Sequence, residues 1–295
     1  MKRILAYFLF GLIWLITIPP ISLLYALSPI LAWILRQVLG YRKDIIKENL
    51  KKSFPEKSGR DLFIIEKAYY AWLGRMFIES FKAVHWSVNT LKKRVKITNP
   101  EVLSEYADTN QDIIILAGHT GNWEWSPGAI SPYGYDVLGI YKPQTSHTFD
   151  LVTKLLRTKS GVIPIPMKGT IRAIKQEKEP GQKPRALLLI ADQIPALGDI
   201  HFWTNFLNQQ TAWFTGGEKL AIRFGLPVFY LRFREIKTGY YAGEFIPLYN
   251  GTEAVVDGEI SKFYIHALEQ TIIENPVHWL WSHRRWKHQP ESLSL

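Results

Sequence analysis

Hydrophobic residues fill most of the first 35 positions and then recur as short, separated runs. Residues 4–35 carry no formal charge, and a helix needs about 20 apolar residues to cross a bilayer core. Pro19 and Pro20 interrupt this stretch, because proline lacks a backbone donor and breaks a helix interior. We therefore predict a hydrophobic membrane-anchor helix within residues 1–35, either as a single tilted span or as a re-entrant pair of half-helices. The alternatives are a cleaved signal peptide, which the length disfavours, and a buried helix pair.

The pattern of apolar positions changes twice further along the chain. Residues 61–84 have the spacing of one long core-facing helix, which Ser58 or Asp61 can cap. Later runs are almost wholly apolar over four to seven positions, as in strands buried on both faces. The predicted strands are residues 112–117, 137–141, 162–165, 186–191 and 227–233, with an edge strand at 240–247, and the helical patterns are at 148–158, 168–176, 212–224 and 258–274.

This alternation of strands and helices predicts an α/β fold with a mostly parallel central sheet flanked by helices. Ligands in such sheets bind beyond the carboxyl ends of the strands. We divide the chain into the anchor at 1–35, a basic helical segment at 36–100 that packs on the core, and the α/β core at 101–295.

The net charge of +10 is unevenly distributed along the chain. Residues 1–35 contribute +2, residues 36–100 contribute +9, and residues 101–295 contribute −1. The cationic cluster directly after the anchor consists of Arg36, Arg42, Lys43, Lys47, Lys51 and Lys52. An excess of Lys and Arg marks the cytoplasmic side of a membrane and attracts anionic lipid. We therefore expect residues 36–295 on the cytoplasmic face of an anionic membrane, with no nucleic-acid partner.

The absence of cysteine narrows the possible chemistry. It excludes a disulfide scaffold, a thiolate zinc site and a cysteine nucleophile. His147, His201 and His266 lack the spacing of metal ligands, and no G-x-S-x-G nucleophile elbow is present. We expect no metal and no cofactor.

The strongest candidates for catalysis follow the first buried run, at residues 117–124 (AGHTGNWE). Five residues of helix turn a side chain by about 140°, so His119 and Glu124 meet only if the chain bends at Gly121 before a helix that begins near Asn122. Glu124 would then accept a hydrogen bond from one ring nitrogen and leave the other as a general base. Amides of the helix would stabilise an oxyanion. Alternatively, both side chains only satisfy backbone groups at the strand end.

Residues 119–124 (HTGNWE) resemble the H-x4-D/E block of the lysophospholipid acyltransferase superfamily. More narrowly, they resemble the late acyltransferases of lipid A biosynthesis, the lauroyl and myristoyl transferases. Further elements with the same order and spacing are Asn49-Leu50 with Ser53-Phe54-Pro55, Tyr141-Lys142-Pro143, Arg157 with Gly161, Asp192-Gln193, and residues 280–287 (LWSHRRWK). The acid is Glu124 where the glycerolipid branch usually has aspartate, and Asn208 stands near the place of a family glycine. The resemblance covers most of the chain.

The resemblance implies an O-acyltransferase of lipopolysaccharide biosynthesis, bound to the bacterial inner membrane with its catalytic part on the cytoplasmic face. It implies transfer of a fatty acyl chain from an acyl carrier protein thioester, or a coenzyme A thioester, to a hydroxyl of a phosphorylated lipid A precursor. His119 is then the general base and Glu124 orients it. Arg157, Asp192 and Gln193 support the site, with Arg157 assigned to a phosphate or to the developing oxyanion.

Four other residues are candidate substrate contacts. They are Asn122, Lys142, Arg232 and Arg234. Arg232 and Arg234 alternate along a predicted strand and share one face, either over the site or at a solvated edge. Residues 283–288 either bind phosphate or the acidic carrier protein, or form a basic tail with Trp286 packed on the core.

Three other functions are compatible with the sequence. An acyltransferase for another lysolipid or aminolipid acceptor would share the fold, and acceptor profiling would separate it. A non-catalytic, membrane-tethered polyanion-binding protein would function without His119. A hydrolase would release free fatty acid even with acceptor present.

Overall fold

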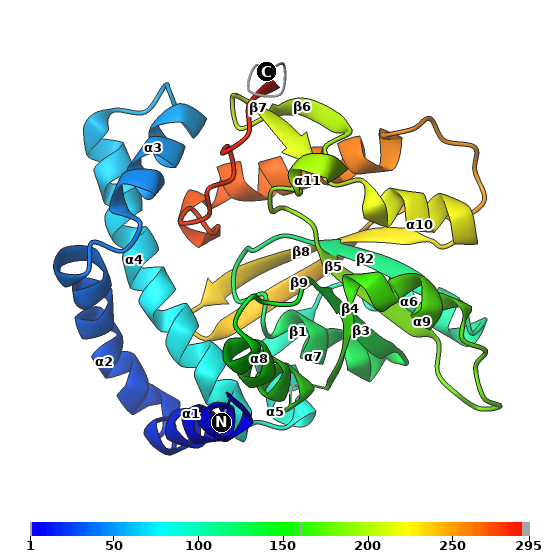
Figure 1. The fold of residues 1–295 in the computed structure, drawn as a ribbon, viewed down its shortest axis with the longest axis horizontal. Helices are drawn as coiled ribbons and strands as arrows, with labels where there is room; N and C mark the ends of the chain where they lie inside the picture. The colour runs from blue at the N-terminus through cyan, green and yellow to red at the C-terminus, as the bar shows by residue number, and fades with distance from the viewer. Residues whose placement is uncertain (1, 160, 291–295) are drawn as a thin grey trace.

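The computed structural model describes residues 2–159 and 161–290 and centres on a seven-stranded sheet (Figure 1). The strand order is β1-β9-β8-β2-β5-β3-β4, and every neighbouring pair is parallel except β8 with β9. The strands are β1 (Val95–Ile97), β2 (Ile113–Ala117), β3 (Asp136–Tyr141), β4 (Val162–Pro166), β5 (Arg185–Ile190), β8 (Val228–Lys237) and β9 (Tyr240–Tyr249). The predicted α/β fold with a mostly parallel sheet is confirmed.

Both faces of the sheet are buried, which explains why its central strands are apolar throughout. In β2, Ile114 and Leu116 belong to one core, whereas Ile113 and Ile115 belong to the other. Helices α3 (Lys43–Ser53), α4 (Gly59–Lys82), α10 (Gly216–Phe224) and α11 (Glu259–Glu274) contribute to the first core, and α5 (Val88–Arg94), α6 (Glu101–Asp108) and α7 (Ser126–Ile130) to the second. Two further helices, α8 (His147–Lys159) and α9 (Thr170–Lys175), follow β3 and β4 along the chain.

The long helix predicted over residues 61–84 is confirmed as α4, and its start follows the expected capping chemistry. Ser58 is the N-cap: its hydroxyl accepts from the Asp61 amide at 3.2 Å, and Asp61 accepts from the Ser58 amide at 3.3 Å. This reciprocal capping box satisfies two amide donors that the first helical turn leaves free.

Two predictions about the sheet and its surroundings were wrong in detail. Strand β9 is not an edge strand, because β1, a three-residue strand within the basic segment, pairs with its outer side. The helix predicted from residue 212 begins only at Gly216, because residues 202–213 form the hairpin of β6 (Phe202–Phe206) and β7 (Gln209–Trp213). Leu207 and Asn208 link these strands with φ of 48° and 60°, the left-handed geometry of a two-residue hairpin turn.

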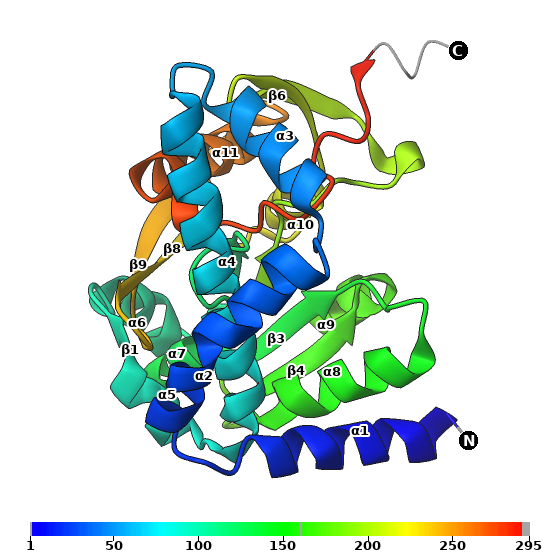
Figure 2. The ribbon, with the colours of Figure 1, turned by 90° about the vertical axis from the view of Figure 1, so that its left-hand side faces the viewer.

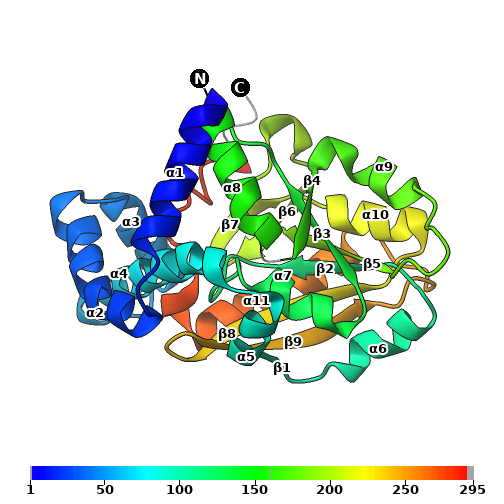
Figure 3. The same ribbon diagram turned by 90° about the horizontal axis from the view of Figure 1, so that it is seen from below.

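The apolar N-terminal region forms two helices, α1 (Lys2–Ile16) and α2 (Ile21–Trp33), and a π-helical turn (Ile34–Val38) continues α2. The break falls at Pro19 and Pro20, as predicted. Helix α2 packs along α4, and α1 packs along α8 (Figures 2 and 3). The continuous segment Ile21–Val38 is long and apolar enough to cross a membrane, judged by length and composition.

A buried ion pair lies at the amino ends of β2 and β5, and loss of one partner is expected to destabilise the protein. Asp112 accepts from the Arg185 amide at 2.7 Å and from its Nε at 2.9 Å, and both residues are largely buried. The substitution Asp112→Ala leaves the Arg185 cation without its carboxylate, so we expect the free energy of unfolding to fall by about 3–5 kcal/mol. Urea denaturation measures this change.

The matched control is Asp108→Ala, since Asp108 is an exposed residue at the end of α6. Its free energy of unfolding is expected to stay within about 0.5 kcal/mol of wild type. Equal small changes in both variants would contradict the role assigned to Asp112.

Candidate active site

His119 and Asp192 meet at the carboxyl edge of the sheet, where the two neighbouring strands β2 and β5 end. His119 Nδ1 lies 2.5 Å from Asp192 Oδ1. The other carboxylate oxygen accepts from the His119 amide and from Trp279 Nε1, both at 2.8 Å. Three protein donors therefore fix the Asp192 carboxylate. Gly118, the residue before His119, lets α11 approach closely, because a Cβ at this position would lie 2.5 Å from Leu268 Cδ1.

The electrostatics of this pair determine which ring nitrogen of His119 is basic. Burial alone would raise the pKa of Asp192, but the charge of His119 and the hydrogen bonds from His119 and Trp279 outweigh burial and lower that pKa to about 2. An ionised carboxylate only accepts hydrogen bonds, so Nδ1 carries the proton of the neutral ring. Nε2 then has a free lone pair. It lies 3.2 Å from the amide nitrogen of the exposed Gln193.

Glu124 pairs with Arg157 instead of His119, which corrects our expectation from the sequence. Arg157 donates to the Glu124 carboxylate twice, from Nε at 3.0 Å and from Nη2 at 2.8 Å. The predicted bend occurs, with φ of 55° at Gly121, but the chain then runs through a turn and α7 begins only at Ser126. This path directs Glu124 toward α8, and it also removes the helix amides expected near Asn122.

The bidentate pair holds both of its members in the charged state. Burial alone would raise the pKa of Glu124, but the charge and hydrogen bonds of Arg157 outweigh burial and lower it. For Arg157, burial lowers the pKa, and the neighbouring Glu124 more than compensates and raises it. Because a guanidinium is planar, the edge that engages Glu124 leaves Nη1 directed away from this carboxylate.

Trp123 connects the His119–Asp192 pair with the Glu124–Arg157 pair. Its ring lies edge-on to the His119 ring with 4.9 Å between centroids. Its Nε1 lies 3.2 Å from Glu124 Oε1 and donates to it. The charge of His119 also contributes to the low pKa of Glu124. Both pairs therefore form one site.

Asn122 lies beneath the site, so we revise its predicted role from substrate contact to positioning. Its side chain is fully buried and donates to Glu79 Oε2 at 2.8 Å. Glu79 also accepts from the hydroxyls of Tyr241 at 2.6 Å and Tyr25 at 2.7 Å. The neighbouring Gly121 amide donates to the His278 carbonyl at 3.0 Å. These bonds hold the loop that carries His119 and Glu124.

Glu79 should make the stability of the protein depend on pH. Burial raises the pKa of this carboxyl above its ordinary 4.5. A raised folded-state pKa gives a contribution to stability that is complete below the unfolded pKa and is lost as pH rises through the folded pKa. Glu79→Gln removes the titration and keeps two polar atoms. We therefore expect the melting temperature of wild type, relative to this variant, to fall as the pH rises above the ordinary range of a carboxyl pKa.

Thermal unfolding at several pH values checks this expectation. Glu105→Gln is the matched control, because Glu105 is exposed on α6. A constant difference between wild type and Glu79→Gln over the whole pH range would contradict the burial argument.

The other predicted contacts lie at different distances from the two pairs. Exposed Lys142 lines a small cavity of about 30 Å³ that Arg157 also lines, so it adjoins the site. Arg232 pairs with Glu244 on β9 at 3.7 Å, and Arg234 is exposed. Within residues 2–159 and 161–290, neither arginine bonds to the His119 or Glu124 pairs. Arg234 fits the solvated interpretation, whereas Arg232 is only partly exposed and its Nε is buried.

The basic sequence near the C-terminus packs against the core. Trp286 stacks on Phe206 with 6.4 Å between centroids, and its Nε1 donates to Thr211. Arg285 is 1% exposed and lies over the Trp213 ring. Burial lowers the pKa of His283 to about 4. These contacts favour the packed-tail interpretation of residues 283–288.

Two supporting residues were missed by sequence reasoning. Trp279 directly precedes the recognised C-terminal motif, and only the fold shows that it donates to Asp192. Glu79 could have been recognised from the sequence, because it lies three residues after Met76 and seven after Trp72, on the apolar face of α4. A carboxylate at such a position is buried and needs partners.

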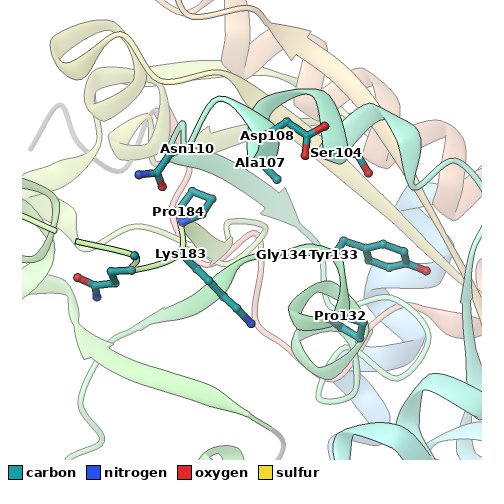
Figure 4. Close-up of a pocket in the computed structure, with 11 residues that line it drawn as sticks. Ser104, Ala107, Asp108, Asn110, Pro132, Tyr133, Gly134, Lys183 and Pro184 are labelled. Atoms are coloured by element: carbon teal, nitrogen blue, oxygen red, sulfur yellow. The ribbon is translucent and has the colours of Figure 1, made fainter. Parts of the chain in front are cut away.

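A sizeable cavity lies at the opposite edge of the sheet from His119. It measures about 610 Å³ and is lined by residues of α6, by residues 132–134 and by the loop that precedes β5 (Figure 4). These segments lie at the amino ends of β3 and β5. Its charged lining residues are Asp108 and Lys183. In the described part of the chain, no group of three His, Asp or Glu residues is arranged to hold a metal ion.

The fold and the site define an α/β protein with a histidine–carboxylate pair at the carboxyl edge of a mostly parallel sheet, beside a carboxylate–arginine pair. Comparison with known families then identifies the chain as a member of the bacterial lipid A biosynthesis acyltransferases, whose family model matches residues 1–288. It is therefore an acyltransferase of lipid A biosynthesis.

Individual relatives agree with this assignment. The chain is 21% identical to a lipid A biosynthesis palmitoleoyltransferase of Escherichia coli (strain K12) over 291 residues, which cover 97% of this chain and 92% of the relative. A lipid A biosynthesis acyltransferase of Shigella flexneri matches to the same extent. A lauroyltransferase of Escherichia coli (strain K12) is 22% identical over 289 residues, 96% of this chain and 91% of the relative.

Proposed function

We propose that the protein transfers a fatty acyl chain from an acyl carrier protein thioester to a hydroxyl of a phosphorylated lipid A precursor at the cytoplasmic face of the bacterial inner membrane. The observation that carries the proposal is the His119–Asp192 pair, which gives Nε2 its lone pair. Family membership supports the acyl transfer. The cationic cluster beside the uncharged N-terminal stretch supports an anionic membrane surface.

His119 acts as the general base in this proposal. Its Nε2 takes the proton of the acceptor hydroxyl after that hydroxyl displaces the exposed Gln193 amide. The hydroxyl oxygen attacks the thioester carbonyl carbon and forms a tetrahedral oxyanion. The carbon–sulfur bond then breaks, and the proton on Nε2 passes to the leaving thiolate. Asp192 stabilises the imidazolium between these two proton transfers.

Arg157 binds an anion in this proposal, either the oxyanion or a phosphate of the acceptor. Glu124 holds the guanidinium in a fixed orientation through two charge-assisted hydrogen bonds. Nη1 of Arg157, which is directed away from Glu124, and Lys142 supply positive charge around the adjoining small cavity, where Lys154 is paired with Asp150 at 2.9 Å. Glu124 thus acts through Arg157 as a positioning residue.

Glu124→Gln is expected to lower kcat/KM about tenfold. The glutamine amide keeps one acceptor oxygen, so one of the two charge-assisted hydrogen bonds from Arg157 is lost, and each 1.4 kcal/mol corresponds to a factor of ten. Steady-state kinetics with a phosphorylated acceptor measure the change. Glu177→Gln, in the loop that precedes β5, is the matched control and should match wild type. If Glu124 acts through Arg157, Glu124→Gln adds little to the loss caused by Arg157→Ala, whereas additive losses in the double variant would contradict this role.

Product analysis tests the proposed reaction against the other functions. The purified full-length protein is incubated with an acyl carrier protein thioester and a lipid A precursor, and the products are separated by mass spectrometry. We expect an acylated precursor and free carrier thiol in equal amounts. Free fatty acid as the main product would indicate a hydrolase, and acylation of a lysophospholipid in preference to the precursor would indicate a different acceptor.

A further inference from the structure

Both ends of helix α1 are bound to the α/β body. At its start, the Thr148 hydroxyl of α8 donates to the Lys2 carbonyl at 3.4 Å. After its end, the ammonium group of Lys82 donates to the carbonyls of residues 17, 18 and 19 at 2.7, 3.2 and 2.9 Å. His85 Nε2 lies 3.0 Å from the Trp14 carbonyl. A helix held at both ends by the same body lies along that body.

The lysine in this arrangement is well suited to fix the turn between the two helices. The proline break leaves carbonyls at the end of α1 without amide donors. Lys82 is buried at the end of α4, and its three ammonium protons match the three carbonyls. The turn is therefore attached to the end of α4, where the chain continues toward β1.

Helix α2 is also bound along its length, to α4. Leu24, Ser28 and Ala32 are buried at helical spacing and form its inner face. The contact is close at Gly74, where a Cβ would lie 3.1 Å from the Ser28 carbonyl. Tyr25 bonds to Glu79 on α4 at 2.7 Å, and Arg36 pairs with Glu66 on α4 at 3.3 Å.

For α1 or α2 to cross a bilayer, the helix would have to separate from the α/β body, or α4 would have to enter the membrane together with it. α1 has 15 residues, which span about 22 Å, less than the roughly 30 Å of a hydrocarbon core. α2 and its π-helical extension are long enough, but α4 beside them exposes Lys67, next to the Glu66 that pairs with Arg36. Charged residues such as these are costly inside hydrocarbon.

Helices α1 and α2 lie on the outside of the molecule (Figure 2). Their outward faces expose many large apolar side chains. Phe8 is 67% exposed, Leu15 61%, and Trp33 59%. We call this surface the N-terminal apolar face: Ile4, Leu5, Tyr7, Phe8, Leu12, Trp14, Leu15, Ile16, Ile18, Leu23, Leu27, Ile30, Trp33, Val38 and Leu39. It contains more than half of the exposed large apolar side chains among the described residues. Soluble monomers rarely leave large apolar patches uncovered.

Cationic residues flank this face at both ends. Lys2 and Arg3 are exposed at the start of α1, and Arg42 and Lys47 are exposed beyond α2. No charged residue interrupts residues 4–35 between them. An apolar surface bordered by cations matches the layering of an anionic lipid leaflet, in which headgroup phosphates lie above acyl chains.

We propose that the N-terminal apolar face lies in the plane of one anionic lipid leaflet and that neither α1 nor α2 crosses the bilayer. The exposed side chains enter the outer part of the acyl region, about 5–10 Å deep. α1 packs on α8, which carries Arg157 of the candidate site. The proposed leaflet surface therefore lies beside the helix that carries Arg157. The proposal uses the proposed membrane-surface action only to choose a bilayer as the partner, and its tests do not measure turnover.

The lack of native cysteine makes labelling of single cysteines unambiguous. Full-length Lys2→Cys and Lys47→Cys variants are expressed in a bacterial inner membrane, and inside-out vesicles are treated with a membrane-impermeant maleimide. We expect both cysteines to react without detergent, because both flanks lie on the same side. A Lys2→Cys variant that reacts only after detergent is added would indicate a span and overturn the proposal.

Depth measurements separate an in-plane arrangement from a re-entrant hairpin. Phe8→Cys, Ile18→Cys and Leu27→Cys variants carry an environment-sensitive fluorophore in vesicles of phosphatidylcholine and phosphatidylglycerol with quenchers at defined depths. We expect similar, shallow quenching at all three positions. Val256→Cys, which replaces an exposed apolar residue between β9 and α11, is the control and should remain unquenched. Deepest quenching at residue 18, or no lipid quenching at any of the three positions, would overturn the proposal.

Discussion

Asp192→Asn is expected to lower kcat about 10³–10⁴-fold while the protein remains folded. The aspartate oxygen Oδ1 faces His119 Nδ1, and Oδ2 accepts from the His119 amide and from Trp279. In the variant, the amide oxygen can keep the two donors, so the new NH2 group faces Nδ1. Nδ1 must then accept, the proton moves to Nε2, and the neutral ring has lost its base.

Initial rates with saturating donor and acceptor measure this effect, and a thermal melt verifies folding. Asp199→Asn is a matched control, because Asp199 is an exposed aspartate seven residues further along the chain. We expect the control to match wild type. A rate for Asp192→Asn within tenfold of wild type would show that the tautomer of His119 does not govern catalysis.

His119→Ala is expected to lower kcat about 10²–10⁴-fold, the usual contribution of a general base. The acceptor hydroxyl then has to lose its proton to water as the thioester is attacked. Because the substitution removes the ring that packs beside Trp123, it leaves space for a small base. Added imidazole should therefore restore part of the lost rate.

The rate of acyl transfer as a function of imidazole concentration checks this prediction. His201→Ala is the control, since His201 is exposed and lies outside the two pairs of the site. It should retain the wild-type rate and gain nothing from imidazole. A His119→Ala variant with a rate within a few-fold of wild type would remove His119 from the catalytic role.

The strands of the sheet could be predicted because burial on both faces leaves an unmistakable apolar run, as in β2 and β5. The bend at Gly121 could be predicted from glycine and the strand end. The hairpin of β6 and β7 could not, since its turn at Leu207 and Asn208 lacks glycine and its strands mix polar and apolar residues. The three-residue β1 is too short to leave a pattern within a basic segment.

The partners within the site were harder to predict than its members. His119, Glu124, Arg157 and Asp192 were all named from the sequence as site residues, but Glu124 was assigned to His119. The true partner, Asp192, lies 73 positions away. Only the adjacency of β2 and β5 in the sheet brings it to the histidine. Sequence spacing describes neighbours along the chain, whereas strand order determines neighbours at a sheet edge.

The two N-terminal apolar helices also show how far sequence-based prediction reaches. Proline chemistry predicts the break between α1 and α2, and charge distribution predicts the flanking cations. Neither reveals that a lysine 65 positions from Thr17 binds its carbonyl. Tertiary contacts of this kind determine whether an apolar segment crosses a membrane or lies on it.

The most direct test of the central claim is the mass of lipid A in a host strain that lacks this gene and carries either the wild-type gene or the Asp192→Asn variant. The account predicts that the wild-type gene raises the mass of lipid A by one fatty acyl chain and that the variant, at equal protein level, does not. Full restoration of the acylated species by the variant, or no acyl-chain difference with the wild-type gene, would contradict the account.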